Sequence, residues 1–256
     1  MPNAVLHQFQ VLGSALSSTA SLWRGTSVYR AALQPEQPLR LYDIEASADC
    51  RVVREALTAL GLDVNVYPCP ERYSRYRPAL LRLRVKEQFP VFEDSNNDTL
   101  LCGARPIIDY LFRTYGGCAT PPVFRLASSG PGVSLLGSVL RGTRGRRARP
   151  SRDPDQLLRL WSFESSPYSR LVRERLTELE LGYTLHNLGK EQFADMGPAA
   201  MRVRPGRYRP KAGGKRERML AQIGRVQVPY LEDPNSGTKL FESAAIIDYL
   251  ETTYAL

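Results

Sequence analysis

Residues 39–62 read LRLYDIEASADCRVVREALTALGL, and residues 158–181 read LRLWSFESSPYSRLVRERLTELEL. The similarity continues further along the chain, where residues 89–116 (FPVFEDSNNDTLLCGARPIIDYLFRTYG) match residues 228–255 (VPYLEDPNSGTKLFESAAIIDYLETTYA). Self-similarity on this scale indicates an internal duplication, which settles the architecture before any single motif does. The chain therefore holds two copies of one unit, which we call copy one and copy two.

Length and composition fit two small domains. The chain has 256 residues, 43% of them hydrophobic and 24% charged, and units of roughly 80 to 100 residues can each bury a core. No uninterrupted apolar stretch approaches the ~20 residues of a membrane-spanning helix. We place a leader or helical segment at 1–37, the first domain at 38–118, a basic linker at 119–156, and the second domain at 157–256 with a basic insertion near 190–222.

Cysteine and histidine usage does not favour a metal site or a disulfide framework. The four cysteines all lie in the first half: Cys50, Cys69, Cys102 and Cys118. They form no CxxC pair and have no histidine at metal-ligand spacing, because His7 and His186 stand far apart. We expect no metal, ordinary polar roles for both histidines, and a reducing compartment.

Apolar spacing predicts the same order of elements in each copy: strand, helix, strand, variable region, strand, strand, helix. Val53, Leu57 and Leu60 recur at helical spacing with Gly61 as a stop, and Gly182 is expected to close the matching helix of copy two. Ser243 is the expected N-cap of the last helix. Strands are expected at 40–43, 64–67, 91–93 and 100–102, and at 183–186, 230–232 and 239–241.

Three motifs appear in this order in both copies. In copy two they are Ser165 to Ser169 (SSPYS), Val228-Pro229 and Phe241-Glu242-Ser243; in copy one they are Ser47 to Cys50 (SADC), Phe89-Pro90 and Cys102-Gly103-Ala104. They resemble the CPYC loop, the cis-proline and the glutamyl-clamp turn of glutaredoxins and glutathione S-transferase N-terminal domains. The whole chain is similar to tandem glutathione S-transferase N-domain proteins of plastids and cyanobacteria. This resemblance implies an α/β fold of two tandem thioredoxin-fold domains, each a four-stranded mixed sheet flanked by helices.

The reactive cysteine that the resemblance places at the start of the first helix is absent from both copies. A thiolate there is stabilised by the helix dipole and by unpaired amides, but the position holds Ser47 in copy one and Ser166 in copy two. A serine hydroxyl cannot form a mixed disulfide, so ordinary thiol-disulfide exchange is excluded. Cys50 occupies the second cysteine position, where we interpret it as a packed core residue, and Ser169 replaces its counterpart.

Glutathione binding is a separate question. No cofactor is required, and the resemblance implies that copy two could bind glutathione through residues of the three motifs. The candidates are Ser166, Tyr168, Val228, Pro229, Glu242 and Ser243. The alternative is that Glu242 and Ser243 simply begin the last helix. Copy one has Gly103 and Ala104 at the turn, and neither copy is expected to continue into the all-helical domain of a full transferase, so conjugating activity is not expected.

Basic residues outnumber acidic ones by 35 to 26, and the excess is clustered. Runs of this kind attract acidic surfaces. An acidic protein or large complex is therefore the favoured partner, and an anionic membrane surface is a second option. The alternative is that these charges face solvent and bind no partner. Nucleic acid is not favoured, because no known binding module is present. The docking candidates are Arg144, Arg146, Arg147, Arg207, Arg209, Lys215 and Arg216.

The first 35 residues contain two arginines, several serines and no Asp or Glu, a composition typical of an organelle transit segment. Two readings stay open. Residues 1–20 are the remainder of a leader, or the segment 21–30, which is echoed at 137–146, is a helix packed ahead of each domain. We expect a chloroplast protein, stromal or thylakoid-associated, after removal of the transit peptide.

Two functional hypotheses follow. In the first, the chain is a non-catalytic scaffold or accessory subunit, a pseudo-enzyme whose basic segments dock an acidic partner near photosynthetic complexes. In the second, copy two is a glutathione-dependent enzyme or sensor that works through Ser166.

Overall fold

Copy one folds in the expected order, because alternating apolar residues form its strands and helically spaced ones form its helices. The computed structural model describes residues 4–20, 22–72, 75–82, 88–128, 144–197 and 208–256. The elements of copy one are β1 (Leu39–Asp43), α2 (Ala48–Leu60), β2 (Val64–Pro68), α3 (Arg77–Arg82), β3 (Val91–Asp94), β4 (Thr99–Cys102), α4 (Ala104–Thr114) and α5 (Pro122–Ala127).

Copy two repeats this order with a different variable region. Its elements are β5 (Leu158–Ser162), α7 (Pro167–Glu178), β6 (Tyr183–Asn187), the 3₁₀ turn η1 (Phe193–Asp195), α8 (Lys215–Ile223), β7 (Tyr230–Asp233), β8 (Thr238–Phe241) and α9 (Ser243–Tyr254). The first two strands of each copy are parallel and the other pairs within a copy are antiparallel. Each copy thus contributes a four-stranded mixed sheet of the thioredoxin type.

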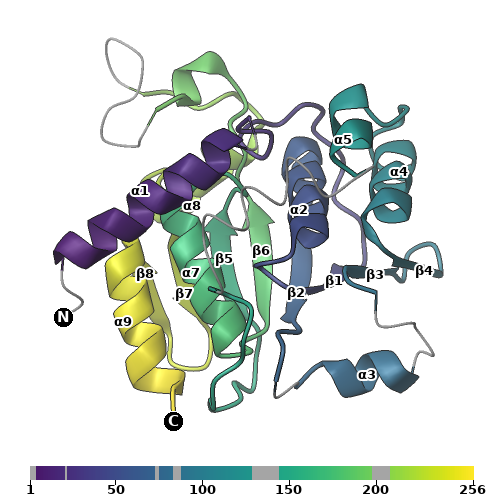
Figure 1. Ribbon diagram of the computed structural model, residues 1–256. Coiled ribbons are helices and arrows are strands. Elements are labelled where there is room, and N and C mark those ends of the chain that lie inside the picture. Colours follow the sequence, from purple (N-terminus) through teal and green to yellow (C-terminus); the bar gives the residue numbers. More distant parts are fainter. Residues whose placement is uncertain (1–3, 21, 73–74, 83–87, 129–143, 198–207) are drawn as a thin grey trace.

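The two sheets join edge to edge. Strands β2 and β6 pair antiparallel through Val64 with Leu185 and Val66 with Tyr183. In the described part of the chain this gives one eight-stranded sheet of order β4-β3-β1-β2-β6-β5-β7-β8 (Figure 1). The exposed edge that each small sheet would otherwise present is therefore paired with the other copy.

One apolar core runs through both copies on one face of the sheet. It combines strand residues such as Leu41 and Leu160 with the inner sides of α2, α4, α5, α7 and α9. On the opposite face α3 and α8 cover two smaller clusters, around Tyr42 and around Tyr230. Because alternate residues of a strand point to opposite faces, both layers are filled from the same strands.

A short extended segment before each copy pairs with the other copy. We call residues 22–30 strap one and residues 144–152 strap two. Strap one pairs at Ser27 with Lys190 of copy two, and strap two pairs at Arg147 with Glu71 of copy one. The predicted helix at 21–30 is therefore wrong: its described residues form a turn and an extended bridge. In the matching segment 137–146, residues 144–146 also form a turn, and 137–143 lie outside the described residues.

The helix of the N-terminal segment lies earlier, as α1 (Ala4–Ala20). It packs on α7 and crosses the amino-terminal ends of α7 and α9 (Figure 1). Its buried residues include Val11, Ser14, Ser17 and Ser18. Residues 4–20 are thus an integral layer of copy two in this fold.

Two helix boundaries differ from expectation. Gly61 ends α2 in the left-handed region as predicted, with φ of 64°, but α7 ends at Glu178, and the left-handed residue there is Glu180 with φ of 48°. Gly182 serves close packing instead, since a Cβ on it would lie 2.7 Å from the Tyr76 hydroxyl and from a Leu157 methyl. The N-cap of α9 is Glu242, and Ser243 is its first residue.

Candidate functional site

Ser47 of copy one acts as a helix cap. Its hydroxyl accepts the Cys50 amide of α2 at 3.4 Å and so satisfies one of the unpaired donors of the first turn. Cys50 itself is fully buried, and its sulfur accepts the Ile44 amide. Burial, reinforced by the Asp43 carboxylate, raises the pKa of the Cys50 thiol well above its usual range. The one cysteine of this loop is therefore a neutral packing residue.

Ser166 of copy two has the same structural role. Its hydroxyl accepts the Ser169 amide at 3.3 Å and the Ser169 hydroxyl at 2.8 Å, which caps α7. Only 3% of Ser166 is exposed. The hydroxyl is thus both engaged and shielded, and it cannot face a substrate in this conformation.

Helix α1 provides that shielding. The Ser18 hydroxyl donates to the Ser165 carbonyl at 3.0 Å, next to Ser166. At the other end of α1, Nε2 of His7 lies 3.0 Å from the hydroxyl of Ser243, which is 2% exposed. The two serines that the sequence proposed as glutathione contacts therefore lie beneath α1.

The other candidates of copy two lie around this covered region. Val228-Pro229 is a cis peptide, as is Phe89-Pro90 in copy one. The Val228 side chain packs in the cluster around Tyr230, and Glu242 is exposed and accepts a hydrogen bond from the Gln227 amide. Tyr168 is 39% exposed on the first turn of α7. The structure thus keeps the motif backbone but separates exposed Glu242 and Tyr168 from buried Ser166 and Ser243.

The corresponding turn of copy one has no side chain with which to hold a ligand. Gly103 has φ of 82° and caps α4 without a side-chain hydrogen bond. Its amide donates to the Pro90 carbonyl at 2.8 Å. A Cβ at Gly103 would lie 3.2 Å from the Gln88 amide nitrogen, so the space beside the turn is already filled.

A buried charge network joins the two copies, and sequence reasoning missed it. Arg54 of α2 contacts Glu164 of copy two at 2.9 Å, and Arg173 of α7 contacts Glu45 of copy one at 3.1 Å. These four side chains are at most 3% exposed. The exchange is reciprocal, because Glu45 and Glu164, like Arg54 and Arg173, occupy equivalent positions of the repeat. The equivalence of these positions in the repeat was the signal in the sequence from which the network could have been found.

Electrostatics explain why the network stays ionised. Burial acts to raise the pKa of the Glu164 carboxyl, but Arg173 and Arg54 outweigh it and hold that pKa at about 2. The copies differ at one neighbour, since Arg54 also binds Asp43 at 2.6 Å while Arg173 donates to the Ser162 hydroxyl at 3.1 Å. Burial raises the pKa of Asp43.

Two further arginines tie α1 to this network. Arg51 of copy one and Arg170 of copy two both donate to the Ser17 hydroxyl, at 2.9 and 2.7 Å. They also reach carbonyls in the last turns of α1, where the helix dipole favours positive charge. Burial, together with the nearby Arg51, lowers the pKa of Arg170 to about 9.

The docking candidates divide into two groups. Arg144, Arg146, Arg147 and Arg209 are exposed, and Arg207 lies outside the described residues. The assignment of Lys215 and Arg216 to a docking surface is wrong, because the side chains of both are bonded inside the fold. Lys215 forms an ion pair with Asp63 of copy one, and Arg216 is 5% exposed and donates to the carbonyls of Gly189 and Leu188.

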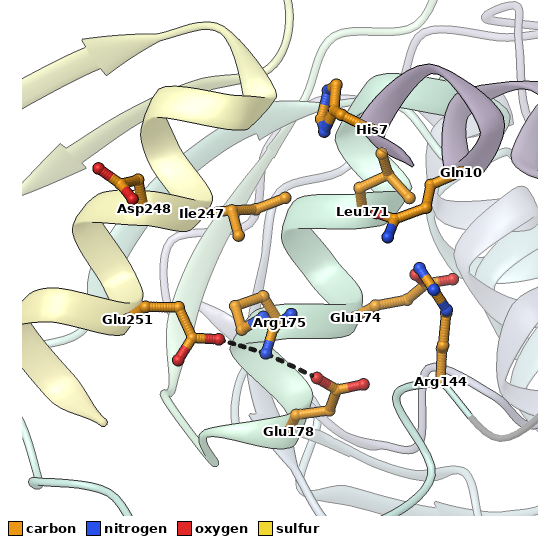
Figure 2. A pocket seen from close by; sticks show the side chains of 10 residues that line it. All are labelled: His7, Gln10, Arg144, Leu171, Glu174, Arg175, Glu178, Ile247, Asp248 and Glu251. Atoms are coloured by element: carbon orange, nitrogen blue, oxygen red, sulfur yellow. Dashed lines mark ion pairs between the residues drawn. The ribbon is translucent and has the colours of Figure 1, made fainter. Parts of the chain in front are cut away.

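A cavity of about 530 Å³ opens beside α1, on the outer surface of α7 and α9 (Figure 2). Arg175 stands in it and forms ion pairs with Glu178 and Glu251, as the dashed lines show. None of the motif residues of copy two lines this cavity. It is therefore distinct from the region in which the resemblance places glutathione. Its lining residues are His7, Gln10, Arg144, Leu171, Glu174, Arg175, Glu178, Ile247, Asp248 and Glu251.

Comparison with known proteins agrees with this architecture. The family model described as Glutathione S-transferase, N-terminal domain, matches residues 41–119 and again residues 160–256. A search of curated proteins found no match. A search of solved structures found none either.

Proposed function

Since the chain belongs to the glutathione S-transferase N-terminal domain family and carries that domain twice, we propose that it is a non-catalytic scaffold or accessory subunit. The observation that carries this proposal is the covering of copy two, where Ser166 and Ser243 are almost fully buried under α1. In copy one the corresponding loop has a capping serine and a neutral, buried thiol. Recognition through the outer surface is the role that this arrangement supports.

The binding surface that we propose for an acidic partner is the exposed part of strap two. Strap two is fixed at both ends, since Glu71 pairs with its backbone and Arg152 donates its amide to the Tyr254 carbonyl at 2.8 Å. Arg146 and Arg149 are already paired with Glu71 and Glu251. Arg144 and Arg147 are the exposed charges that we expect to meet the partner.

This surface can be tested by charge reversal. We predict that Arg144→Glu with Arg147→Glu reduces salt-sensitive co-purification of an acidic partner from native cells by at least about tenfold, because close charge pairs dominate such contacts. The matched control reverses the exposed Arg30 and Arg113, which changes net charge equally. Equal loss in both variants, or no loss in either, contradicts the proposed surface.

We also propose that the protein works in a plastid, near photosynthetic complexes. The support is the sequence resemblance to plastid and cyanobacterial tandem proteins; the acid-free composition of the first 35 residues no longer counts toward it, because α1 is a packed part of the fold. Fractionation of native cells tests it. Recovery with thylakoids or stroma agrees with the proposal, and recovery elsewhere refutes it.

The alternative function, a glutathione-binding enzyme or sensor, is tested by thermal shift. A ligand that binds only the folded state raises the melting temperature as its concentration exceeds the dissociation constant. We expect no shift with millimolar reduced glutathione in the wild type. A shift that is abolished by Glu242→Ala would favour the alternative and refute the scaffold proposal.

A further inference from the structure

The outward face of α1 is apolar. Phe9, Leu12 and Leu16 follow one another at helical spacing along one side and are 66%, 59% and 60% exposed. A helix on the surface of a globular protein ordinarily buries its apolar side and exposes its polar side. In α1 the buried side instead carries His7, Val11, Ser14, Ser17 and Ser18.

Polar contacts fix this orientation. Ser17 accepts hydrogen bonds from the arginines Arg51 and Arg170, and Ser18 donates to the Ser165 carbonyl. Rotating the helix to bury Phe9 and Leu12 would remove these contacts, and the buried arginines Arg51 and Arg170 would lose the hydroxyl and carbonyls of α1 that they bind, which is costly. The exposure of the apolar side is therefore built into the fold.

The chain displays further apolar side chains where α1 ends. Leu22 and Trp23 both have φ of 54°, a backbone region that bulky side chains rarely adopt. Hydrogen bonds from their amides to the Thr19 and Ser18 carbonyls hold this turn. Leu22 is 73% exposed, Trp23 41% and Tyr29 68%.

We propose that the outward face of α1, with Leu22 and Trp23, docks on the surface of an anionic lipid bilayer. Helix α1 carries no Asp, Glu, Lys or Arg, and no acidic residue precedes Glu36, so this end of the chain does not repel an anionic surface. The net charge of +9 attracts the chain as a whole to such a surface. Phe and Leu side chains enter the headgroup boundary, and Trp and Tyr favour that depth. Two copies of a +9 chain repel each other, which disfavours a second copy as the occupant.

The helix lies on this surface and does not cross it. Among the described residues, no helix combines the length and apolar character that a membrane span needs. The lipid-docking face differs from the arginine surface of strap two, so this inference goes beyond the proposed function. A protein with both surfaces would hold its acidic partner beside a membrane.

Vesicle co-sedimentation tests the proposal with the full chain. The vesicles are phosphatidylcholine alone and phosphatidylcholine mixed with phosphatidylglycerol. We expect binding to the anionic vesicles, at least about tenfold weaker for the variant Phe9→Ser/Leu12→Ser/Leu16→Ser, because each buried methylene contributes to partitioning. The matched control, Leu100→Ser/Val123→Ser/Leu126→Ser, changes three other exposed apolar residues and should bind like the wild type.

Several outcomes would overturn the proposal. Failure of the wild type to bind anionic vesicles is one, and equal binding by the α1 variant and the wild type is another. A third is a light-scattering mass that shows a dimer of the wild type and a monomer of the α1 variant, which would assign the face to a second copy. Emission from Trp23, compared in wild type and Trp23→Phe, gives an independent readout, and we expect a blue shift on binding.

Discussion

Single atoms decide the chemistry of both loops. Ser47 and Ser166 place oxygen where a nucleophilic sulfur would have to be, and both hydroxyls are engaged as helix caps. The sulfur of Cys50 lies one turn further on, buried and held as a neutral thiol. Because the thiolate is the form that attacks a disulfide, neither loop can begin an exchange reaction.

This assignment predicts an order of thiol reactivity. In a short pulse of iodoacetamide at neutral pH, Cys118, which is half-buried, should be alkylated well before Cys50 and Cys69, which are fully buried. Burial raises the pKa of both slow thiols, so their thiolate fraction is small. Peptide mass spectrometry after the pulse measures the order. Rapid labelling of Cys50 in the folded protein would contradict the assignment.

The residues of the two loops could be predicted from the sequence, because the duplication placed Ser47 opposite Ser166. The burial of Ser166 could not. It depends on α1, whose serines contact arginines and carbonyls that are far away in the chain. Likewise Lys215 and Arg216 read as a solvated run, and only the fold shows that their partners are Asp63 and the Leu188 and Gly189 carbonyls.

Among the elements, α1 determines what copy two can do. It is held to α9 by the hydrogen bond between His7 and Ser243, to α7 by the bond between Ser17 and Arg170, and to the loop before α7 by Ser18. The sequence pattern alone favours burial of its Phe and Leu side chains. The polar surface that receives the helix reverses this preference.

The packing of α1 against copy two should become less stable at acidic pH. Burial lowers the pKa of His7 below its ordinary value of 6.5, so the folded state favours the neutral ring. The folded-state stability from this group is then fully present above the unfolded pKa and falls as the pH drops through that value. We predict faster hydrogen exchange in α1 at pH 5 than at pH 7, and a smaller difference in His7→Gln. Equal pH dependence in both proteins would contradict this role.

At the scale of the whole molecule, the central feature is the continuous sheet with the charge network across its middle. Each copy supplies one Glu and one Arg to the other, so the buried ion pairs inside each copy are joined into one network across the sheet. The paired residues were visible in the repeat. The contacts between them were not predictable, because an Arg on a helix and a Glu in the loop before it ordinarily face solvent.

Removing one charge of the network should therefore destabilise the whole chain. We predict that Glu164→Gln lowers the free energy of unfolding by about 3 to 5 kcal/mol, because it leaves buried arginines under-compensated. The control Glu93→Gln breaks the exposed pair with Arg40 and should cost less than about 1 kcal/mol. Urea denaturation measures both, and similar losses would contradict the account.

The same network gives a pH signature. The pKa of Glu164 is held at about 2 in the folded protein, against an ordinary value of 4.5. Its stabilisation is therefore present above the ordinary value and is lost as the pH falls through the low folded value. The stability difference between wild type and Glu164→Gln should shrink over that range. A difference that is constant with pH would show that Glu164 acts by packing alone.

The most direct test of the central claim, that neither copy performs thiol chemistry, is the rate of glutathione-dependent disulfide reduction by the full chain. The account predicts that wild-type protein and a variant with all four cysteines replaced by serine both leave the rate at its uncatalysed value. Turnover that is retained without any cysteine, or that disappears in Cys50→Ser alone, would contradict it.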